Sequence, residues 1–241
     1  HGHSSGVLGL AALPDGRRAL SAAYDGSLRL WDVESGETIR IMAGHDDLVN
    51  ALIVLPQGRR AISASGDRTL RLWDLDAGAA LRVLKGHTGP VLSVAALPGS
   101  QQVISAGGDG MLRVWDLETG AMLRTLAGHR AAVRDVAALP DGRHALSASY
   151  DHTLRLWDLV AGTQLAVLHL VEEPVCLAAV DARRVAVHAQ RHPEVGVEPH
   201  RRVAALAAED DVVGLQRQYP LAQITPPPGP SQHDLCPQPI A

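Results

Sequence analysis

A stretch of nine residues occurs four times in this chain, and each copy begins 42 residues after the last. It reads YDGSLRLWD from Tyr24, GDRTLRLWD from Gly66, GDGMLRVWD from Gly108 and YDHTLRLWD from Tyr150. A fixed internal period of this length is typical of stacked or radial repeat proteins, in which each unit is one small supersecondary structure. Such a unit cannot bury its apolar face alone, so the copies must pack against one another.

Each repeat is expected to hold four short strands. In the first copy we expect them at residues 7–13, 18–22, 28–31 and 38–42. Turn sequences separate them, such as Pro14-Asp15-Gly16, and the third strand alternates with a period of two rather than 3.6. A sheet of four short antiparallel strands leaves an apolar face uncovered, and radial stacking of such sheets gives a propeller.

Four marks recur in register without an insertion: a Gly-His pair, a serine in the second strand, an aspartate in the following turn and a Trp-Asp pair at the end of the third strand. The sets are His3, Ser21, Asp25 and Trp31; His45, Ser63, Asp67 and Trp73; His87, Ser105, Asp109 and Trp115; and His129, Ser147, Asp151 and Trp157. This pattern resembles the WD40 repeat family over residues 1 to about 168.

The resemblance implies an all-β fold, a WD40-type β-propeller with four regular four-stranded blades of 42 residues and a degenerate fifth blade. Four blades are the smallest number that propellers use, and the family usually has seven. Two alternatives remain: the blades close a small ring, or the chain is a fragment of a larger propeller. We favour the fragment, because the sequence begins inside a repeat junction.

The resemblance also implies that each set of marks forms a structural hydrogen-bond chain. Serine, histidine and aspartate are the ingredients of a catalytic triad, but an active site is normally built once and this set is built four times. A buried neutral histidine can join the aspartate to the serine, whose oxygen can accept the tryptophan N–H. We therefore predict no catalytic residue, and no enzyme. The repeated Arg29, Arg71, Arg113 and Arg155 are interpreted as structural or solvated rather than as a ligand ring.

Composition narrows the classes of partner. The net charge of −4 and the absence of a basic run argue against nucleic acid. No apolar run approaches the length of a membrane span. The two cysteines, Cys176 and Cys236, and the loose cluster of His188, His192 and His200 lack metal-site spacing. We expect no cofactor, no metal and no membrane, and a reducing, cytoplasmic location.

The regular pattern decays after residue 168. The domain organisation that we expect is four WD40 blades in residues 1–168, a degenerate fifth blade or capping segment in 169–218, and a Pro-rich, disordered tail in 219–241. Residues 174–180 and 183–189 can still form two strands, but Leu170-Val171 replaces Gly-His and Pro199-His200 replaces Trp-Asp.

The function that this organisation favours is a non-catalytic protein–protein interaction scaffold. The alternative is a sensor or autoinhibitory module of a larger signalling NTPase or kinase. Positions that vary between copies are free to bind, and the resemblance places them at loop ends on one face, around the channel mouth. The predicted protein-binding residues are Tyr24, Leu48, Asn50, Leu92, Arg134 and Tyr150. An open stack of blades is also expected to self-associate through its uncovered apolar face.

Overall fold

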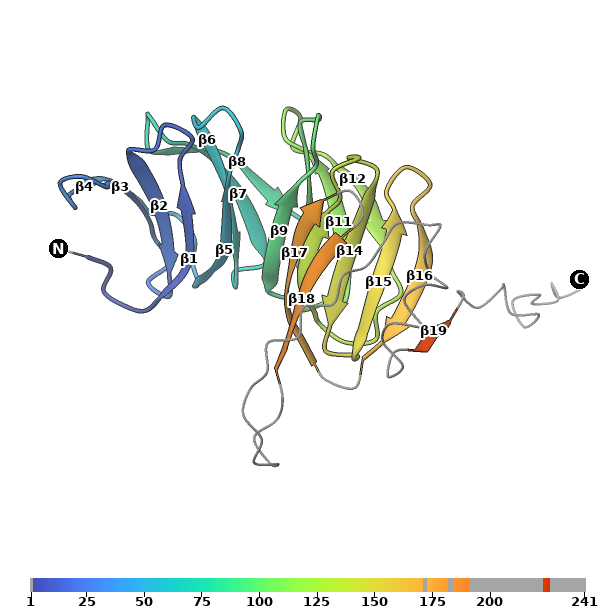
Figure 1. The fold of residues 1–241 in the computed structure, drawn as a ribbon. Coiled ribbons are helices and arrows are strands. Elements are labelled where there is room, and N and C mark those ends of the chain that lie inside the picture. Colours follow the sequence, from blue (N-terminus) through green and yellow to red (C-terminus); the bar gives the residue numbers. More distant parts are fainter. Residues whose placement is uncertain (1, 171–172, 182–183, 191–222, 226–241) are drawn as a thin grey trace, which may run out of the picture.

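The computed structural model describes residues 2–170, 173–181, 184–190 and 223–225, and its described elements are all β-strands (Figure 1). Sixteen strands between Val7 and His169 form four antiparallel sheets, in each of which four strands lie side by side in chain order. We call these sheets blades 1 to 4. The predicted all-β class and the four-stranded blades are thus confirmed. The described residues contain no helix that could span a membrane.

The strand bounds repeat closely from blade to blade. Blade 1 holds β1 (Val7–Ala12), β2 (Arg18–Ala23), β3 (Leu28–Asp32) and β4 (Thr38–Met42). Blade 2 holds β5 (Val49–Val54), β6 (Arg60–Ser65), β7 (Thr69–Asp74) and β8 (Ala79–Lys85). Blade 3 holds β9 (Val91–Ala96), β10 (Gln102–Gly107), β11 (Leu112–Asp116) and β12 (Met122–Leu126). Blade 4 holds β13 (Val133–Ala138), β14 (His144–Ser149), β15 (Thr153–Asp158) and β16 (Thr163–His169).

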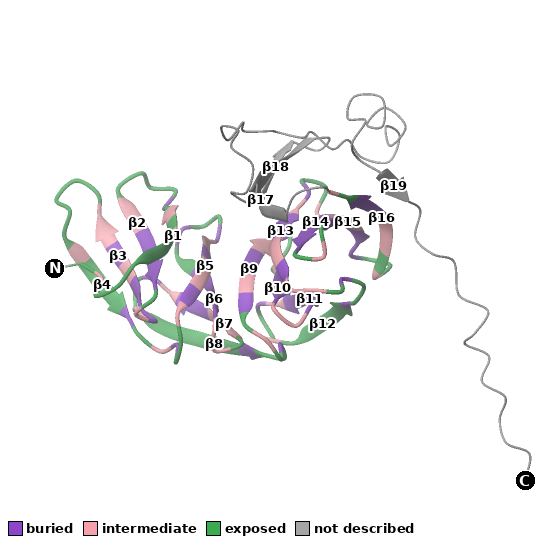
Figure 2. Cartoon of the chain, turned by 90° about the horizontal axis from the view of Figure 1, so that it is seen from below, coloured by how far each residue is buried: buried purple, intermediate pink, exposed green. Residues whose placement is uncertain are grey.

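The blades stand in an open arc (Figure 2). The first strands, β1, β5, β9 and β13, line its concave side, and the fourth strands lie on its convex side. We call the face of a blade that is turned toward the next blade its outgoing face and the opposite one its incoming face; at each junction the outgoing face of one blade packs on the incoming face of the next. Between these faces lie three separate apolar cores, one at each junction between blades. Apolar burial between sheets therefore holds the arc together.

Two strands continue the series beyond blade 4. The strands expected in this region are present as β17 (Glu173–Asp181) and β18 (Arg184–Gln190), which pair as a two-stranded antiparallel sheet. β17 contacts β13 and β14, just as β13 contacts β9 and β10. It therefore occupies the place of a first strand on the outgoing face of blade 4.

The remainder of the C-terminal region contributes one described strand. β19 (Gln223–Thr225) pairs antiparallel with β16 and adds a fifth strand to the outer edge of blade 4. It lies in the stretch that the sequence predicts to be disordered. The other residues of that stretch, and those between β18 and Pro220, lie outside the described residues.

Candidate protein-binding face

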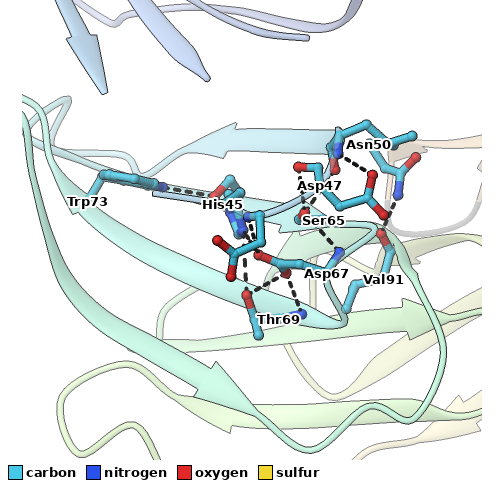
Figure 3. A network of polar contacts seen from close by, with 11 residues as sticks. His45, Asp47, Asn50, Ser65, Asp67, Thr69, Trp73 and Val91 are labelled. Atoms are coloured by element: carbon cyan, nitrogen blue, oxygen red, sulfur yellow. Dashed lines mark hydrogen bonds and ion pairs between the residues drawn. The ribbon is translucent and has the colours of Figure 1, made fainter. Parts of the chain in front are cut away.

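The four repeated marks of blade 2 meet in one hydrogen-bonded chain (Figure 3). The Nδ1 atom of His45 lies 2.7 Å from an Asp67 carboxylate oxygen, and its Nε2 atom lies 2.6 Å from the Ser63 hydroxyl. The indole N–H of Trp73 donates to the same hydroxyl at 2.8 Å. Because a carboxylate only accepts, the proton of His45 belongs on Nδ1, and Nε2 accepts from Ser63.

The other three blades repeat this chain. The distance from histidine Nδ1 to the carboxylate is 3.0 Å for His3, 3.0 Å for His87 and 2.9 Å for His129. The corresponding distances from Nε2 to the serine are 2.7, 2.8 and 2.7 Å. Each tryptophan N–H also donates to the serine of its own blade. The structure thus brings together all sixteen side chains that the sequence groups into four sets.

These serines lie inside the blades, where their hydroxyls are already engaged. Ser63, Ser105 and Ser147 are fully buried and Ser21 nearly so. Each hydroxyl already accepts from an indole and lies beside an imidazole nitrogen, so the polar groups satisfy one another inside an apolar blade.

Burial and hydrogen bonding set the charge states of these chains. Burial lowers the pKa of His45, His87 and His129, because an imidazolium loses its hydration there, while the neighbouring aspartate opposes the shift. Burial raises the pKa of Asp109, but hydrogen bonds from the Thr88 N–H, His87 and Arg113 outweigh it and bring that pKa down to about 2. The imidazole rings of these three histidines are therefore neutral near pH 7, and the carboxylate of Asp109 is charged.

A further hydroxyl completes the chain, and the sequence interpretation missed it. Two residues after the turn aspartate, Ser27, Thr69 and Thr153 donate to that carboxylate at 2.7, 2.7 and 2.6 Å. Blade 3 has Met111 at this position, and there Arg113 donates to Asp109 at 2.7 Å instead. Aligning the four turns exposes the signal, since only the third copy lacks a hydroxyl.

The burial of the repeated arginines narrows the sequence interpretation, which allowed structural or solvated positions. Arg113 is buried, and Arg29, Arg71 and Arg155 are half-buried, so none of them is a solvated side chain. Arg71 and Arg155 lie beneath the glycines of the Gly-His pairs, where a Cβ on Gly44 or Gly128 would stand 2.7 Å from their Nη1 atoms. These arginines are therefore structural positions, and the glycines at 44 and 128 leave room for the guanidinium groups of Arg71 and Arg155.

The predicted binding residues lie along one edge of the arc. Tyr24 and Tyr150 begin the turns that follow β2 and β14, and they are 53% and 44% exposed. Their backbone N–H groups bond to Gly6 and Ala132, just before β1 and β13. Turns after second strands and entries to first strands therefore share an edge, as antiparallel pairing requires.

The other four candidate binding residues are less exposed than the tyrosines, and one of them makes a hydrogen bond to the next blade. Leu48 immediately precedes β5, Leu92 lies at the start of β9 and Arg134 at the start of β13, and each is half-buried. The side chain of Asn50 donates to the backbone carbonyl of Val91 at 2.8 Å (Figure 3). Asn50 thus joins blade 2 to blade 3, a role that its variability between copies does not reveal.

One family model matches the chain four times, and each match ends with the third strand of a blade, so that the last three matches begin with the fourth strand of the preceding blade. The model described as "WD domain, G-beta repeat" matches residues 1–32, 36–74, 78–116 and 120–158. The chain belongs to the WD40 family. WD40 repeats generally mediate protein–protein interactions, and the family is generally non-catalytic.

Comparison with solved structures supports the same fold for this WD40 chain. A structure titled "Structure of U3-55K" superposes with a TM-score of 0.73 at 26% sequence identity, over 78% of this chain and 60% of that one. The chain therefore spans only 60% of that neighbour's length. No curated protein matches the sequence. Among the described residues, no group of three histidine, cysteine or acidic side chains is placed to hold a metal ion.

Proposed function

We propose that this WD40 chain is a non-catalytic scaffold that binds a protein partner on the edge carrying Tyr24 and Tyr150. The observation that carries the proposal is the exposure of these two tyrosines at equivalent turns of blades 1 and 4, at the two ends of the arc. Tyrosine combines a large apolar body with a polar tip and is a favoured anchor at protein interfaces.

The residues that lie between the two tyrosines on this edge are also accessible to a partner. Leu48, Leu92 and Arg134 enter the first strands of blades 2, 3 and 4 and remain partly accessible. A partner that contacts both tyrosines would pass over these residues. Arginine is also enriched at binding hot spots. Asn50 lies in the second position of β5, and its amide is already bonded to the backbone carbonyl of Val91.

Substitutions on the two sides of the arc test this proposal. Tyr150→Ala and Arg134→Ala should each weaken a partner isolated by pull-down by ~1–3 kcal/mol. Arg17→Ala and Arg59→Ala are matched controls, because both arginines are exposed near turns that join first and second strands, on the opposite edge. Thermal melts of all four variants should match the parent. Weaker binding by the controls, with the tyrosine variant unaffected, would place the binding surface on the opposite edge.

The second candidate is a sensor or autoinhibitory module of a larger signalling NTPase or kinase in the cytoplasm. The regular spacing of the four blades favours it, since arrays of similar blades are typical of the ends of such signalling proteins. The two candidates differ in what the edge binds. A catalytic domain of the parent polypeptide that binds in trans and loses activity on binding would favour the module over the general scaffold.

A further inference from the structure

The residue that follows each Gly-His pair is held by its backbone and presents its side chain to solvent. Its backbone N–H donates to the turn aspartate of the same repeat, at 2.9–3.2 Å. These residues are Ser4, Asp46, Thr88 and Arg130, and all four are exposed. Because the backbone alone makes this common contact, the side chain can differ between blades, and it is cationic only in blade 4.

In blade 4 this residue lies beside the exposed tyrosine of the following turn. The N–H of Arg130 donates to the carboxylate of Asp151 at 3.0 Å, and Asp151 directly follows Tyr150. The N–H of Tyr150 in turn donates to the carbonyl of Ala132 at 3.0 Å. Two hydrogen bonds therefore hold the loop that carries Arg130 against the turn that carries Tyr150.

Arg134 reaches the same edge through a β-bulge. The pairing of β13 with β14 passes from Val133 opposite Ser149 to Asp135 opposite Ala148, so Arg134 is an extra residue between two paired ones. Bulges often re-aim a side chain and are common beside functional sites. The other blades have a bulge at the same position, and the residues there are Leu8, Asn50 and Leu92. Blade 4 alone thus has arginine at both variable positions.

Three arginines give this part of the edge a positive charge. Arg130 is exposed and Arg134 is half-buried, and within the described part of the chain neither guanidinium group has a hydrogen-bond or ion-pair partner. Burial lowers the pKa of the half-buried Arg155, and the nearby charge of Arg130 adds to that shift, whereas Asp151 opposes it. Like charges that are held close together in this way attract an anion.

The carboxylates of this region are already engaged. Asp151 accepts from His129 at 2.9 Å and lies 3.7 Å from Arg155, and its side chain is only 8% exposed. Asp135 accepts from the hydroxyl of Ser93 in blade 3 and from the backbone of the residue that follows it. Neither carboxylate therefore replaces an external anion at Arg130.

The chemistry of this group fits carboxylates on a peptide. A guanidinium group binds a carboxylate through two parallel hydrogen bonds, and a neighbouring tyrosine adds apolar contact area. A long polyanion is less suitable, because the chain has a net charge of −4 and blade 2 carries Asp46 at the position of Arg130.

We propose that Arg130, Arg134 and Tyr150 form a subsite that binds an acidic segment of the protein partner, a short stretch with several Asp or Glu side chains. This proposal rests on the proposed function, since it names the chemistry of the partner on the same edge. The two arginines pair with carboxylates, and Tyr150 packs on the apolar part of the segment. Asp46 repels the same segment at blade 2, so the charges also fix where on the edge it binds.

Selection from a phage-displayed library of random decapeptides tests this subsite. Peptides that bind the full chain should contain at least about twice as many acidic residues as the library does, since complementary charge favours them. The charge-reversed chain, Arg130→Glu with Arg134→Glu, should lose this enrichment and bind the selected peptides at least about 10-fold more weakly. Arg17→Glu with Arg59→Glu is the matched control on the opposite edge, because it changes the net charge equally, and its binding should equal that of the parent.

A neutral chain, Arg130→Gln with Arg134→Gln, guards against misfolding of the reversed one. It should also bind the acidic peptides more weakly than the parent, and its thermal melt should match that of the parent, because neither guanidinium group has a described partner. Unchanged binding by this neutral chain would overturn the proposal.

Tyr150→Ala separates the failure of this proposal from the failure of the proposed function. Selected peptides that lack acidic enrichment but are lost in Tyr150→Ala would overturn the acidic subsite and leave the protein-binding edge in place. Peptides that bind all of these variants as well as the parent would overturn both, as would a parent chain that selects no peptide. Binding of a single-stranded oligouridylate that is lost in the charge-reversed chain, without acidic enrichment of peptides, would assign the arginines to nucleic acid instead.

Discussion

Replacing Trp73 with alanine, and comparing the result with Trp31→Ala, isolates the energy of packing between blades. The two tryptophans end equivalent third strands and donate equivalent hydrogen bonds, to Ser63 at 2.8 Å and to Ser21 at 2.7 Å. They differ in what covers them. Trp73 is 1% exposed in the core between blades 1 and 2, whereas Trp31 lies on the uncovered incoming face of blade 1.

The expected difference follows from the area buried. A tryptophan buries roughly 150–250 Å², which at ~25 cal/mol per Å² gives about 4–6 kcal/mol as an upper estimate for Trp73. Substitutions of this kind in cores cost about 3–5 kcal/mol. Trp31 lacks the contribution of a preceding blade and should lose about 1–2 kcal/mol, most of it contact within blade 1. The lost hydrogen bond is the same in both variants and cancels in the comparison.

Amide hydrogen exchange is the suitable assay, because stacked repeats can unfold in parts and one melting temperature then mixes several events. Exchange free energies for β6 and β7 should fall by about 3–5 kcal/mol in Trp73→Ala, and those for β2 and β3 by about 1–2 kcal/mol in Trp31→Ala. Far-UV circular dichroism in urea provides a second measure of the same order. Equal losses in the two variants would refute the reasoning, because Trp31 would then be as fully packed in solution as Trp73.

Two further perturbations address the hydrogen-bonded chains. Ser105→Ala should reduce the free energy of unfolding by about 1–3 kcal/mol in urea melts, because it leaves the buried N–H of Trp115 and Nε2 of His87 without their common partner; a loss near zero would show that these groups find other partners. Acidification should also destabilise the chain, because burial lowers the folded pKa of His45, His87 and His129 below the unfolded value of 6.5. As the pH falls, the histidines of the unfolded state bind protons before those of the folded state, so the stability that is present above pH 6.5 is lost. The expected loss in the free energy of unfolding is up to about 4 kcal/mol in total between pH 7.5 and 5.5. Urea melts at these two pH values would contradict the assignment if they gave equal stability.

The regular part of the fold could be predicted because one pattern is written four times. The period fixes the register, so the strand expected at residues 28–31 is found as Leu28–Asp32 and its copies follow without an insertion. The resemblance to WD40 repeats, rather than the spacing itself, implies that the histidine, serine, aspartate and tryptophan of each set are hydrogen-bonded to one another. Side chains that recur at fixed separations in a repeated strand–turn–strand unit must occupy equivalent places in each copy.

Features that depend on a single copy were harder to predict. The arginine positions are uniform along the sequence, yet in blade 3 Arg113 donates to the turn aspartate at 2.7 Å, where Met111 has no hydroxyl to do so. Asn50 varies between copies and so resembles a free surface position, although its amide bonds to the next blade. A position that varies between repeats is one that the common fold does not require. Its side chain can still make a contact that is specific to one junction between blades, as that of Asn50 does.

The uncovered face of blade 1 marks a deeper limit of sequence reasoning. Val7 and Val49 hold the same position of the same motif, yet one is 54% exposed and the other fully buried. Nothing local distinguishes them, because both begin a first strand of six residues. The difference arises only from whether a preceding blade is present. In such a chain the repeat gives every blade the same surface positions. Contacts between blades then determine which of those surfaces are buried in a core and which remain accessible.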